Sequence, residues 1–321
     1  MADETAGSGD PLHRLLSLLV RESPNPTVIK GPEDWWRVHH ALTERCASPF
    51  HHAVLGGFSA DRLGWAFASG YQGALRVLLP SYEPDAKVVL AATESEGNHP
   101  KNIRSQLTLQ NQGWRLDGAK EWITLGSLAD VMLVAASEGK HDDGRNRIAV
   151  VRVPRQRQGV HVEKLPTPPF APEVPHARVR FEGTPVEATE RLPGDGYSDY
   201  VKPFRTIEDV YVHGALLGWL IQIARRAGWS EAHLQELFAL LTAAHGLSRA
   251  SAASPVIHVA LAGLLEATER FLTRAGHYRL WEQVDETTRA RWERDRALLD
   301  VAAKARERRI RTAWNRVRMT H

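Results

Sequence analysis

Cysteine is almost absent from this 321-residue sequence, in which Cys46 is the single example. One cysteine cannot build an internal disulfide framework, and no Cys-x-x-Cys pair exists for a zinc ribbon or a redox dithiol. Long apolar runs are lacking too, since none approaches the ~18 residues that a membrane span requires. Residues 1–10 are acidic and lack the basic start of a secretory signal. These absences predict a protein of the reducing cytoplasm that does not enter a membrane.

Neither sign of charge dominates: 41 lysines and arginines face 38 aspartates and glutamates, which leaves a formal net charge of +3. So small a surplus does not indicate a nucleic-acid partner. Arginines nevertheless gather near the end of the sequence, at Arg289, Arg291, Arg294, Arg296, Arg306, Arg308, Arg309, Arg311, Arg316 and Arg318. Carboxylates are interleaved with them, at Glu293, Asp295, Asp300 and Glu307. The mixture favours a solvated helix face with i to i+4 ion pairs, and nucleic-acid binding is the less favoured alternative.

Sequence motifs for phosphate, hydrolase and zinc chemistry are also missing. Gly113, Gly118 and Lys120 approach a phosphate-binding loop. However, Ala119 separates glycine from lysine, and Glu121 stands where a Ser or Thr would hold magnesium. Neither a Gly-x-Ser-x-Gly elbow nor a His-Glu-x-x-His zinc signature occurs.

Five potential metal ligands lie close together in the sequence: His39, His40, Cys46, His51 and His52. Adjacent side chains on a helix point about 100° apart, so each histidine pair offers one useful ligand at best. We therefore predict surface or capping histidines here, and no metal site.

Helical spacing dominates residues 11 to about 82. A first helix has one apolar face, formed by Leu12, Leu15, Leu16 and Leu19. Further helices are expected from Pro32 onward and over residues 63–79, before Pro80.

From Lys87 to Phe181 the pattern changes to short runs of β-forming residues. These runs are 88–92, 103–109, 113–116, 122–124, 131–135, 148–153, 160–162 and 179–181. Because no helical stretch separates them, they predict an antiparallel sandwich or barrel rather than βαβ units. Asn111-Gln112-Gly113 is expected to form a hairpin turn. The five prolines from Pro166 to Pro175 predict an extended loop.

Beyond Pro203 the sequence is helical again. Long helices are expected over 203–226, 230–245, 255–283 and 286–317. Helices of this length with short connections pack most economically as an antiparallel bundle. The sequence thus predicts an α+β fold with three domains: an N-terminal helical domain over 1–86, a middle β-domain over 87–195 and a C-terminal antiparallel helical bundle over 196–321.

One ordered series of residues carries a resemblance to a known family. It comprises Thr93-Glu94, Gly113 to Leu116, Gly118-Ala119-Lys120-Glu121-Trp122-Ile123-Thr124, Gly126, Ala129-Asp130 and Leu133-Val134. The series is similar to the middle domain of acyl-CoA dehydrogenases, in which a Thr-Glu-Pro stretch is followed, after a hairpin, by a Gly-x-Lys-x-Trp-Ile-Thr run. The resemblance covers about 88–220. The fold that it implies, a helical domain, a small β-barrel and a helical bundle, has the order of elements expected above.

The resemblance implies FAD as the cofactor. In the family, the threonine before Glu and the Trp and Thr of the Trp-Ile-Thr run line the flavin, which here gives Thr93, Trp122 and Thr124. A hydroxyl can hydrogen-bond the flavin ring, while an indole can cover one of its faces. His99 takes the place of a serine that contacts the cofactor's pyrophosphate, and an imidazole can also meet phosphate. As an alternative, Trp122 and Thr124 alternate as any half-buried pair on a strand would.

The sequence also departs from the family. Leu125 replaces an asparagine, and neither an Arg-x-Phe-Gly run nor a Gly-Gly-x-Gly-Tyr segment occurs. These departures leave open a catalytically inactive relative that keeps the fold and serves a binding or assembly role.

Desaturation of an acyl thioester requires a carboxylate within hydrogen-bond reach of the substrate's α proton. Some family members place this base in the first helix of the bundle, and the segment 204–210 aligns with that context. Glu208 is therefore the candidate base. As an alternative, Glu208 lies in the first turns of a helix whose capping box is formed by Thr206 and Asp209.

Taken together, the resemblance implies a flavin-dependent oxidoreductase that desaturates an acyl thioester carried by CoA or a carrier protein. It also implies an electron-transfer partner and a homodimer or homotetramer formed through the bundle. Trp281, Trp292 and Trp314 agree with such an interface, because interfaces are enriched in tryptophan.

Overall fold

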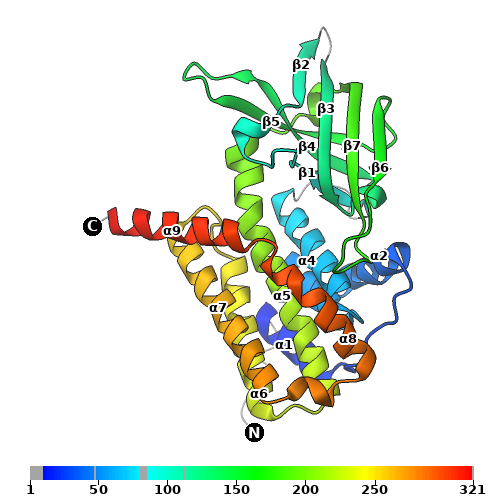
Figure 1. Ribbon diagram of the computed structural model, residues 1–321, viewed down its shortest axis with the longest axis vertical. Coiled ribbons are helices and arrows are strands. Elements are labelled where there is room, and N and C mark those ends of the chain that lie inside the picture. Colours follow the sequence, from blue (N-terminus) through cyan, green and yellow to red (C-terminus); the bar gives the residue numbers. More distant parts are fainter. Residues whose placement is uncertain (1–9, 47, 80–84, 111–112, 320–321) are drawn as a thin grey trace. The chain divides into compact units, whose positions relative to one another are not determined.

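The computed structural model describes residues 10–46, 48–79, 85–110 and 113–319. The chain divides into two compact units. The helical unit comprises Met1–Ala74, Pro169–Ala171 and Thr206–His321, and the β unit comprises Leu75–Pro168 and Pro172–Arg205. The expected α+β class and the order helical, β, helical are confirmed (Figure 1).

Helices follow one another along the first and last parts of the chain (Figure 1). They are α1 (Pro11–Arg21), α2 (Pro32–Ala41), α3 (Pro49–Ser59), α4 (Leu63–Leu78), α5 (Lys202–Arg226), α6 (Glu231–Ser248), α7 (Pro255–His277), α8 (Glu286–Asp295) and α9 (Ala303–Met319). In the described part of the chain, no helix is long and apolar enough to cross a membrane.

Capping residues and prolines set several helix starts. At α1 the Asp10 carboxylate accepts the Leu12 N–H at 3.0 Å, and Pro11 follows in the first helical position. The Asp10 side chain supplies an acceptor for an N–H that has no partner within the helix. Pro11 has no N–H that would need an acceptor. Of the predicted apolar face, Leu15 and Leu19 are buried in the helical unit.

The last helices differ from the sequence expectation. α7 ends at His277, after which Arg279 adopts a left-handed φ of 57° and a 3-10 turn spans Leu280–Gln283. The expected single helix over 286–317 is wrong, because a 3-10 segment at Arg296–Asp300 separates α8 from α9. Apolar spacing continues through this break, so periodicity alone could not reveal it.

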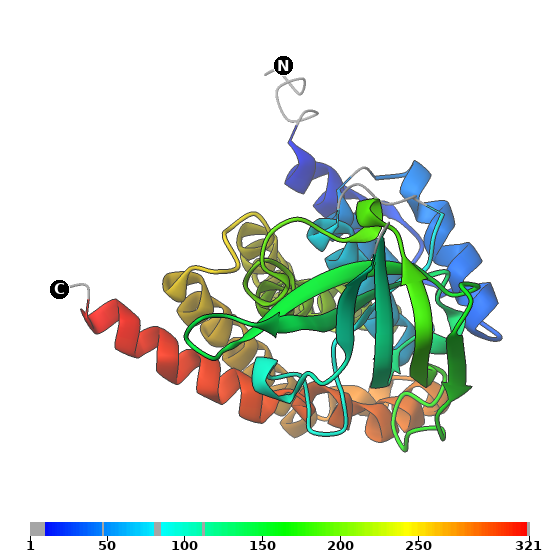
Figure 2. The same ribbon diagram turned by 90° about the horizontal axis from the view of Figure 1, so that it is seen from above.

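The β unit contains one curled sheet (Figure 2). Its strands are β1 (Val88–Ala91), β2 (Gln106–Gln110), β3 (Gly113–Thr124), β4 (Val131–Lys140), β5 (Asn146–Pro154), β6 (Val160–Lys164) and β7 (His176–Val186). The strand order is β1-β4-β2-β3-β7-β6, with β5 also paired to β4. β4 runs parallel to β1 and β2, whereas the other pairs are antiparallel. The sheet is therefore mixed rather than wholly antiparallel as predicted.

β3 is longer than the sequence indicates, because the runs expected at 113–116 and 122–124 are the two ends of this one strand. Gln110 and Gly113 pair across the β2–β3 hairpin. The Asn111 and Gln112 of the predicted turn lie outside the described residues. The expected proline-rich loop over 166–175 contains neither helix nor strand.

Glycines bring α5 against α3 within the helical unit. A Cβ at Gly218 would overlap the carbonyl oxygen of Val54, and one at Gly214 would lie 2.6 Å from the Phe50 ring. A larger side chain at either position would therefore push the two helices apart.

The clustered histidines are not on the surface, contrary to the sequence prediction. His39, His51 and His52 are buried, with 1%, 7% and 2% exposure. The rings of His39 and His52 stack with centroids 4.0 Å apart, and His39 also stacks on Trp35. Helical spacing does not distinguish a polar surface from this aromatic core. No group of three or more His, Cys, Asp or Glu residues among those described is arranged to hold a metal ion.

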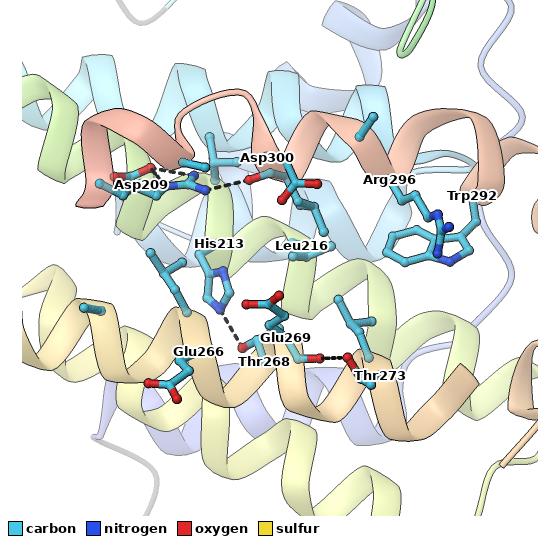
Figure 3. A pocket seen from close by; sticks show the side chains of 18 of the residues that line it. Asp209, His213, Leu216, Glu266, Thr268, Glu269, Thr273, Trp292, Arg296 and Asp300 are labelled. Atoms are coloured by element: carbon cyan, nitrogen blue, oxygen red, sulfur yellow. Dashed lines mark hydrogen bonds and ion pairs between the residues drawn. The ribbon is translucent and has the colours of Figure 1, made fainter. Parts of the chain in front are cut away.

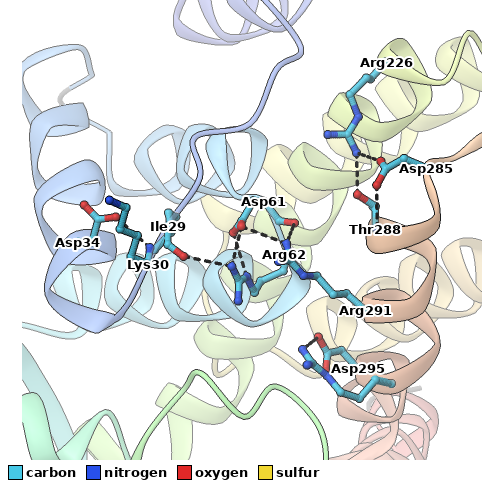
Figure 4. Close-up of polar contacts among 11 residues, drawn as sticks. Ile29, Lys30, Asp34, Asp61, Arg62, Arg226, Asp285, Thr288, Arg291 and Asp295 are labelled. Carbon is cyan, nitrogen blue, oxygen red and sulfur yellow. Dashed lines mark hydrogen bonds and ion pairs between the residues drawn. The ribbon is translucent and has the colours of Figure 1, made fainter.

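Several arginines of the last helices make long-range contacts instead of the predicted i to i+4 pairs. Arg291 of α8 donates to the buried Asp61 at 3.1 Å, and Arg62 donates to Asp61 at 2.7 Å (Figure 4). Arg62 also donates to the Ile29 carbonyl oxygen at 3.1 Å. These bonds connect α8 to the segment between α3 and α4, so these arginines stabilise tertiary contacts.

Candidate functional site

A buried ion pair connects the two segments of the β unit that carry the predicted flavin contacts. Lys120 Nζ lies 2.5 Å from Glu94 Oε1, and Lys120 is fully buried. The Glu121 N–H donates to the Thr93 carbonyl oxygen at 2.9 Å. Since Thr93 precedes Glu94 and Trp122 follows Glu121, these bonds hold the predicted contacts at fixed positions in the sheet.

Trp122 lies at a bulge in β3. The pairing of β3 with β7 shifts between Lys120 and Ile123, and Trp122 between them has a left-handed φ of 54°. For a bulky residue this conformation costs on the order of 1 kcal/mol, and such strain is concentrated at functional sites. The bulge leaves the indole 57% exposed. The alternative of a regular strand alternation at this position is therefore wrong.

Thr124 and His176 lie beside this indole. Thr124 is half-buried and pairs with His176 across β3 and β7, while the rings of Trp122 and His176 meet edge to face at 6.3 Å. Burial lowers the pKa of His176, against the opposing effect of a backbone hydrogen bond to Val174. Its buried Nδ1 has no hydrogen-bond partner among the described residues. The sequence carries no signal for His176, because its place beside Trp122 follows from the strand register.

His99 lies on a short exposed segment of the β unit. Its Nδ1 accepts the Lys101 N–H at 3.3 Å at the start of a 3-10 turn, Pro100–Asn102. The neighbouring Asn98 is held by Arg205, which donates to its side-chain oxygen at 2.7 Å. In the part of the chain that the structure describes, no hydrogen bond or ring contact joins His99 to Thr93 or Trp122.

Glu208 belongs to the helical unit, in which it is half-buried on α5. One turn further on, Tyr211 is buried, and burial raises the pKa of its hydroxyl to about 12. The proposed capping box is wrong: α5 begins at Lys202, and Asp209 bonds to Arg306 and Arg309 of α9. Glu208 therefore lies beyond the first turn and is not explained by capping.

The helical unit contains a pocket of about 810 Å³ among α5, α7, α8 and α9 (Figure 3). His213 lies at its wall, with Nε2 2.8 Å from Thr268 Oγ1. The Thr268 hydroxyl donates to the Leu264 carbonyl, so His213 donates to Thr268. Glu208 does not line this pocket.

Of the tryptophans expected at an interface, Trp281 and Trp292 are buried and stacked 4.6 Å apart, whereas Trp314 is 43% exposed.

Comparison with known proteins points to one class. Residues 89–184 match the family model of the acyl-CoA dehydrogenase middle domain. No curated protein matches the sequence.

Solved structures share the fold over most of the chain. Butyryl-CoA dehydrogenase from Megasphaera elsdenii aligns with a TM-score of 0.71 and 13% identity, over 89% of this chain and 90% of that one. Glutaryl-CoA dehydrogenase from Mycobacterium smegmatis aligns with a TM-score of 0.69 and 15% identity, over 94% and 93%. A structure of PigA with FAD and proline aligns with a TM-score of 0.65 and 11% identity, over 89% and 90%.

The architecture is thus that of the acyl-CoA dehydrogenase class. Residues 89–184 match the middle domain of that family in sequence, and the chain shares the family's fold over most of its length.

Proposed function

We propose that this protein is a flavin-dependent oxidoreductase that desaturates an acyl thioester between its α and β carbons. The observation that carries the proposal is the bulge at Trp122, within the segment that matches the family model. There an exposed indole, a threonine and a histidine whose pKa is lowered by burial lie together. Two proteins of similar fold are named for CoA thioesters, and another was solved with FAD.

The proposed cofactor is FAD, and each predicted residue has a role toward it. Trp122 covers one face of the flavin and excludes water, Thr93 and Thr124 offer hydroxyls to its ring, and His99 meets the pyrophosphate. When bound, FAD supplies the acceptor for the hydride that leaves the β carbon. Glu208 accepts the α proton as the general base.

The first test is the visible absorption spectrum of the purified protein, before and after incubation with FAD and desalting. Flavin retained in near-stoichiometric amount would support the proposal. Glu208→Gln should then keep the flavin and lose about 10²-fold or more in acyl-CoA oxidation. Glu231→Gln, at an exposed position on α6, is the matched control. Protein that never retains flavin contradicts the oxidoreductase function, whereas a fully active Glu208→Gln contradicts only the assignment of the base.

A second candidate function is that of a catalytically inactive relative with a binding or assembly role. The observation that favours it is His99, which stands exposed where the family has a serine and already accepts a hydrogen bond from Lys101. Protein without flavin, yet stably folded, is the expected result for this candidate.

The same proposal extends to partners and location. The acyl group is carried by CoA or a carrier protein, an electron-transfer protein reoxidises the flavin, and the protein acts as a homo-oligomer in the cytoplasm.

A further inference from the structure

The pocket of the helical unit is large enough to hold a small molecule. Its volume of about 810 Å³ lies within the range of about 300–1,000 Å³ that is usual for ligand sites. The proposed desaturation does not use this pocket, because neither Glu208 nor any of the predicted flavin contacts lines it. The lining of the pocket therefore defines the chemistry of a separate ligand.

Aliphatic side chains form the floor of the pocket. Five of them line it and are half-buried: Val212, Leu265, Leu272, Leu299 and Ile310. They come from α5, α7, α9 and the 3-10 segment between α8 and α9. The stacked indoles of Trp281 and Trp292 line the pocket as well. Because removal of apolar surface from water is favourable, this floor favours a ligand with a hydrocarbon chain or ring.

Carboxylates outnumber cations in the lining of the pocket. Against Arg296 and Arg306 stand six acidic residues: Asp209, Glu266, Glu269, Glu293, Asp300 and Glu307. Asp209, Glu266 and Glu293 form ion pairs with arginines. Glu269, Asp300 and Glu307 are exposed and form no ion pair with another described residue (Figure 3 labels the first two). The surplus of negative charge favours a cationic ligand.

His213 adds a hydrogen-bond acceptor to the wall of the pocket (Figure 3). Burial, and then the charge of Arg306, lower the pKa of His213 to about 4, so the ring is neutral at pH 7. Since Nε2 donates to Thr268, the Nδ1 of the neutral ring carries a lone pair. This Nδ1 has no hydrogen-bond partner among the described residues, although His213 is only 6% exposed. The wall therefore favours a ligand that donates an N–H group.

The acceptor and the free negative charge lie close together along the chain. Glu269 directly follows Thr268, the residue to which His213 donates, and both Glu269 and His213 line the pocket. A protonated amine can donate one N–H to a carboxylate and another to an imidazole nitrogen, and hydrogen bonds to charged groups are the stronger ones. A bare metal ion would meet the carboxylates but would leave the aliphatic floor uncovered.

We propose that this pocket binds an organic cation that carries N–H groups, namely a primary ammonium group on a hydrocarbon chain or ring. Glu269 and the Nδ1 of His213 accept its hydrogen bonds, and Asp300 contributes a second negative charge. The hydrocarbon part covers the aliphatic floor. This inference does not depend on flavin chemistry.

The test is isothermal titration calorimetry of the full chain at pH 7 with four probes that share one hydrocarbon chain. Octylammonium should bind. Octyltrimethylammonium keeps the charge but has no N–H, octanol has no charge, and octanoate has the opposite charge. Each of these three should bind about tenfold or more weakly than octylammonium, because each loses at least one hydrogen bond to a charged group.

Two pairs of substitutions locate the binding. Glu269→Gln with Asp300→Asn removes the charge at exposed positions of the pocket. This variant should bind octylammonium about tenfold or more weakly and bind octanol as wild type does. The matched control, Asp142→Asn with Glu163→Gln, makes the same two changes at exposed positions of the β unit and should bind both probes as wild type does.

Three results would overturn the proposal. They are a wild type that does not bind octylammonium, an affinity for octanol or octyltrimethylammonium equal to that for octylammonium, and a pocket variant that binds octylammonium as tightly as wild type. The titration is repeated on protein without flavin and should give the same affinities. Failure of the proposed flavin chemistry would therefore leave these outcomes unchanged.

Discussion

At the scale of single residues, Lys120 and Glu94 differ in the number of hydrogen bonds that each makes besides their ion pair. Lys120 has Glu94 as its one partner among the described residues, and burial lowers its pKa to about 8. Glu94 also accepts the N–H groups of Arg104 and Ser105 and the Ser105 hydroxyl. Burial raises the pKa of Glu94, but Lys120 and these donors outweigh burial and leave it below its usual value. The carboxylate thus has other support, and the ammonium does not.

We therefore predict that Glu94→Gln destabilises the protein more than Lys120→Met. Loss of the carboxylate leaves a buried charge without a partner, which costs about 3 kcal/mol or more. Loss of the ammonium leaves a carboxylate with three remaining hydrogen bonds. Urea unfolding at pH 7 measures both free energies, and equal losses would show that the other donors do not support Glu94.

At the same scale, His213 is expected to make the stability of the protein depend on pH. Burial, and then the charge of Arg306, lower the pKa of His213 from 6.5 to about 4, against an opposing effect of Asp209. Between these values the unfolded chain binds a proton that the folded chain does not, so stability falls as the pH falls. This histidine should cost about 2 kcal/mol of unfolding free energy between about pH 7 and about pH 5. His213→Gln, which keeps a donor for Thr268, should be less acid-sensitive than wild type by that amount. An identical pH dependence in both proteins would contradict the assignment.

At the scale of elements, helix contacts in the helical unit depend on which glycines face another backbone. A Cβ at Gly218 of α5 would collide with the Val54 carbonyl, whereas a Cβ at Gly263 of α7 has no atom within 4 Å. The two glycines lie in helices and look alike in the sequence. Only the first is required by packing.

Gly218→Ala is therefore expected to destabilise the protein by about 3 kcal/mol, because α3 and α5 must separate. Gly263→Ala is expected to stabilise it by about 0.5–1 kcal/mol, because alanine favours the helix. Thermal unfolding of both variants measures these changes in stability. A Gly218→Ala protein as stable as wild type would show that the two helices do not require this glycine.

The same scale shows what the sequence could and could not predict. Apolar periodicity located most helices, and the Thr93-Glu94 and Trp122-Ile123-Thr124 motifs pointed to the right class of fold. The bulge at Trp122 and the approach of His176 depend on pairing with β7, about fifty residues away, which local patterns do not encode. The buried histidines and the break between α8 and α9 were missed for a similar reason. Tertiary contacts there override a helical spacing that looks continuous.

At the scale of the whole molecule, the proposed FAD site would make the stability of the protein depend on its ligand. A cofactor that binds only the folded state stabilises it according to its free concentration relative to its Kd. For FAD this linkage is testable without a substrate.

FAD at about a hundredfold over its Kd should raise the unfolding free energy by about 2.7 kcal/mol and raise Tm accordingly. Trp122→Ala should abolish most of this shift, because it removes the indole proposed to cover the flavin. Trp314→Ala, the other exposed tryptophan, should keep the shift and weaken self-association instead. A shift of full size in Trp122→Ala would contradict the proposed flavin site.

Because the tryptophans differ in exposure, their fluorescence can report on flavin binding and on self-association. Trp122 and Trp314 are exposed and Trp114 is half-buried, whereas the other seven are buried: Trp35, Trp36, Trp65, Trp219, Trp229, Trp281 and Trp292. A collisional quencher such as acrylamide should therefore reduce mainly the red-shifted emission of the two exposed indoles. Shielding on addition of FAD would report on Trp122, and shielding on concentration of the protein would report on Trp314. Quenching of the native fluorescence thus measures changes around Trp122 and around Trp314 without an added label.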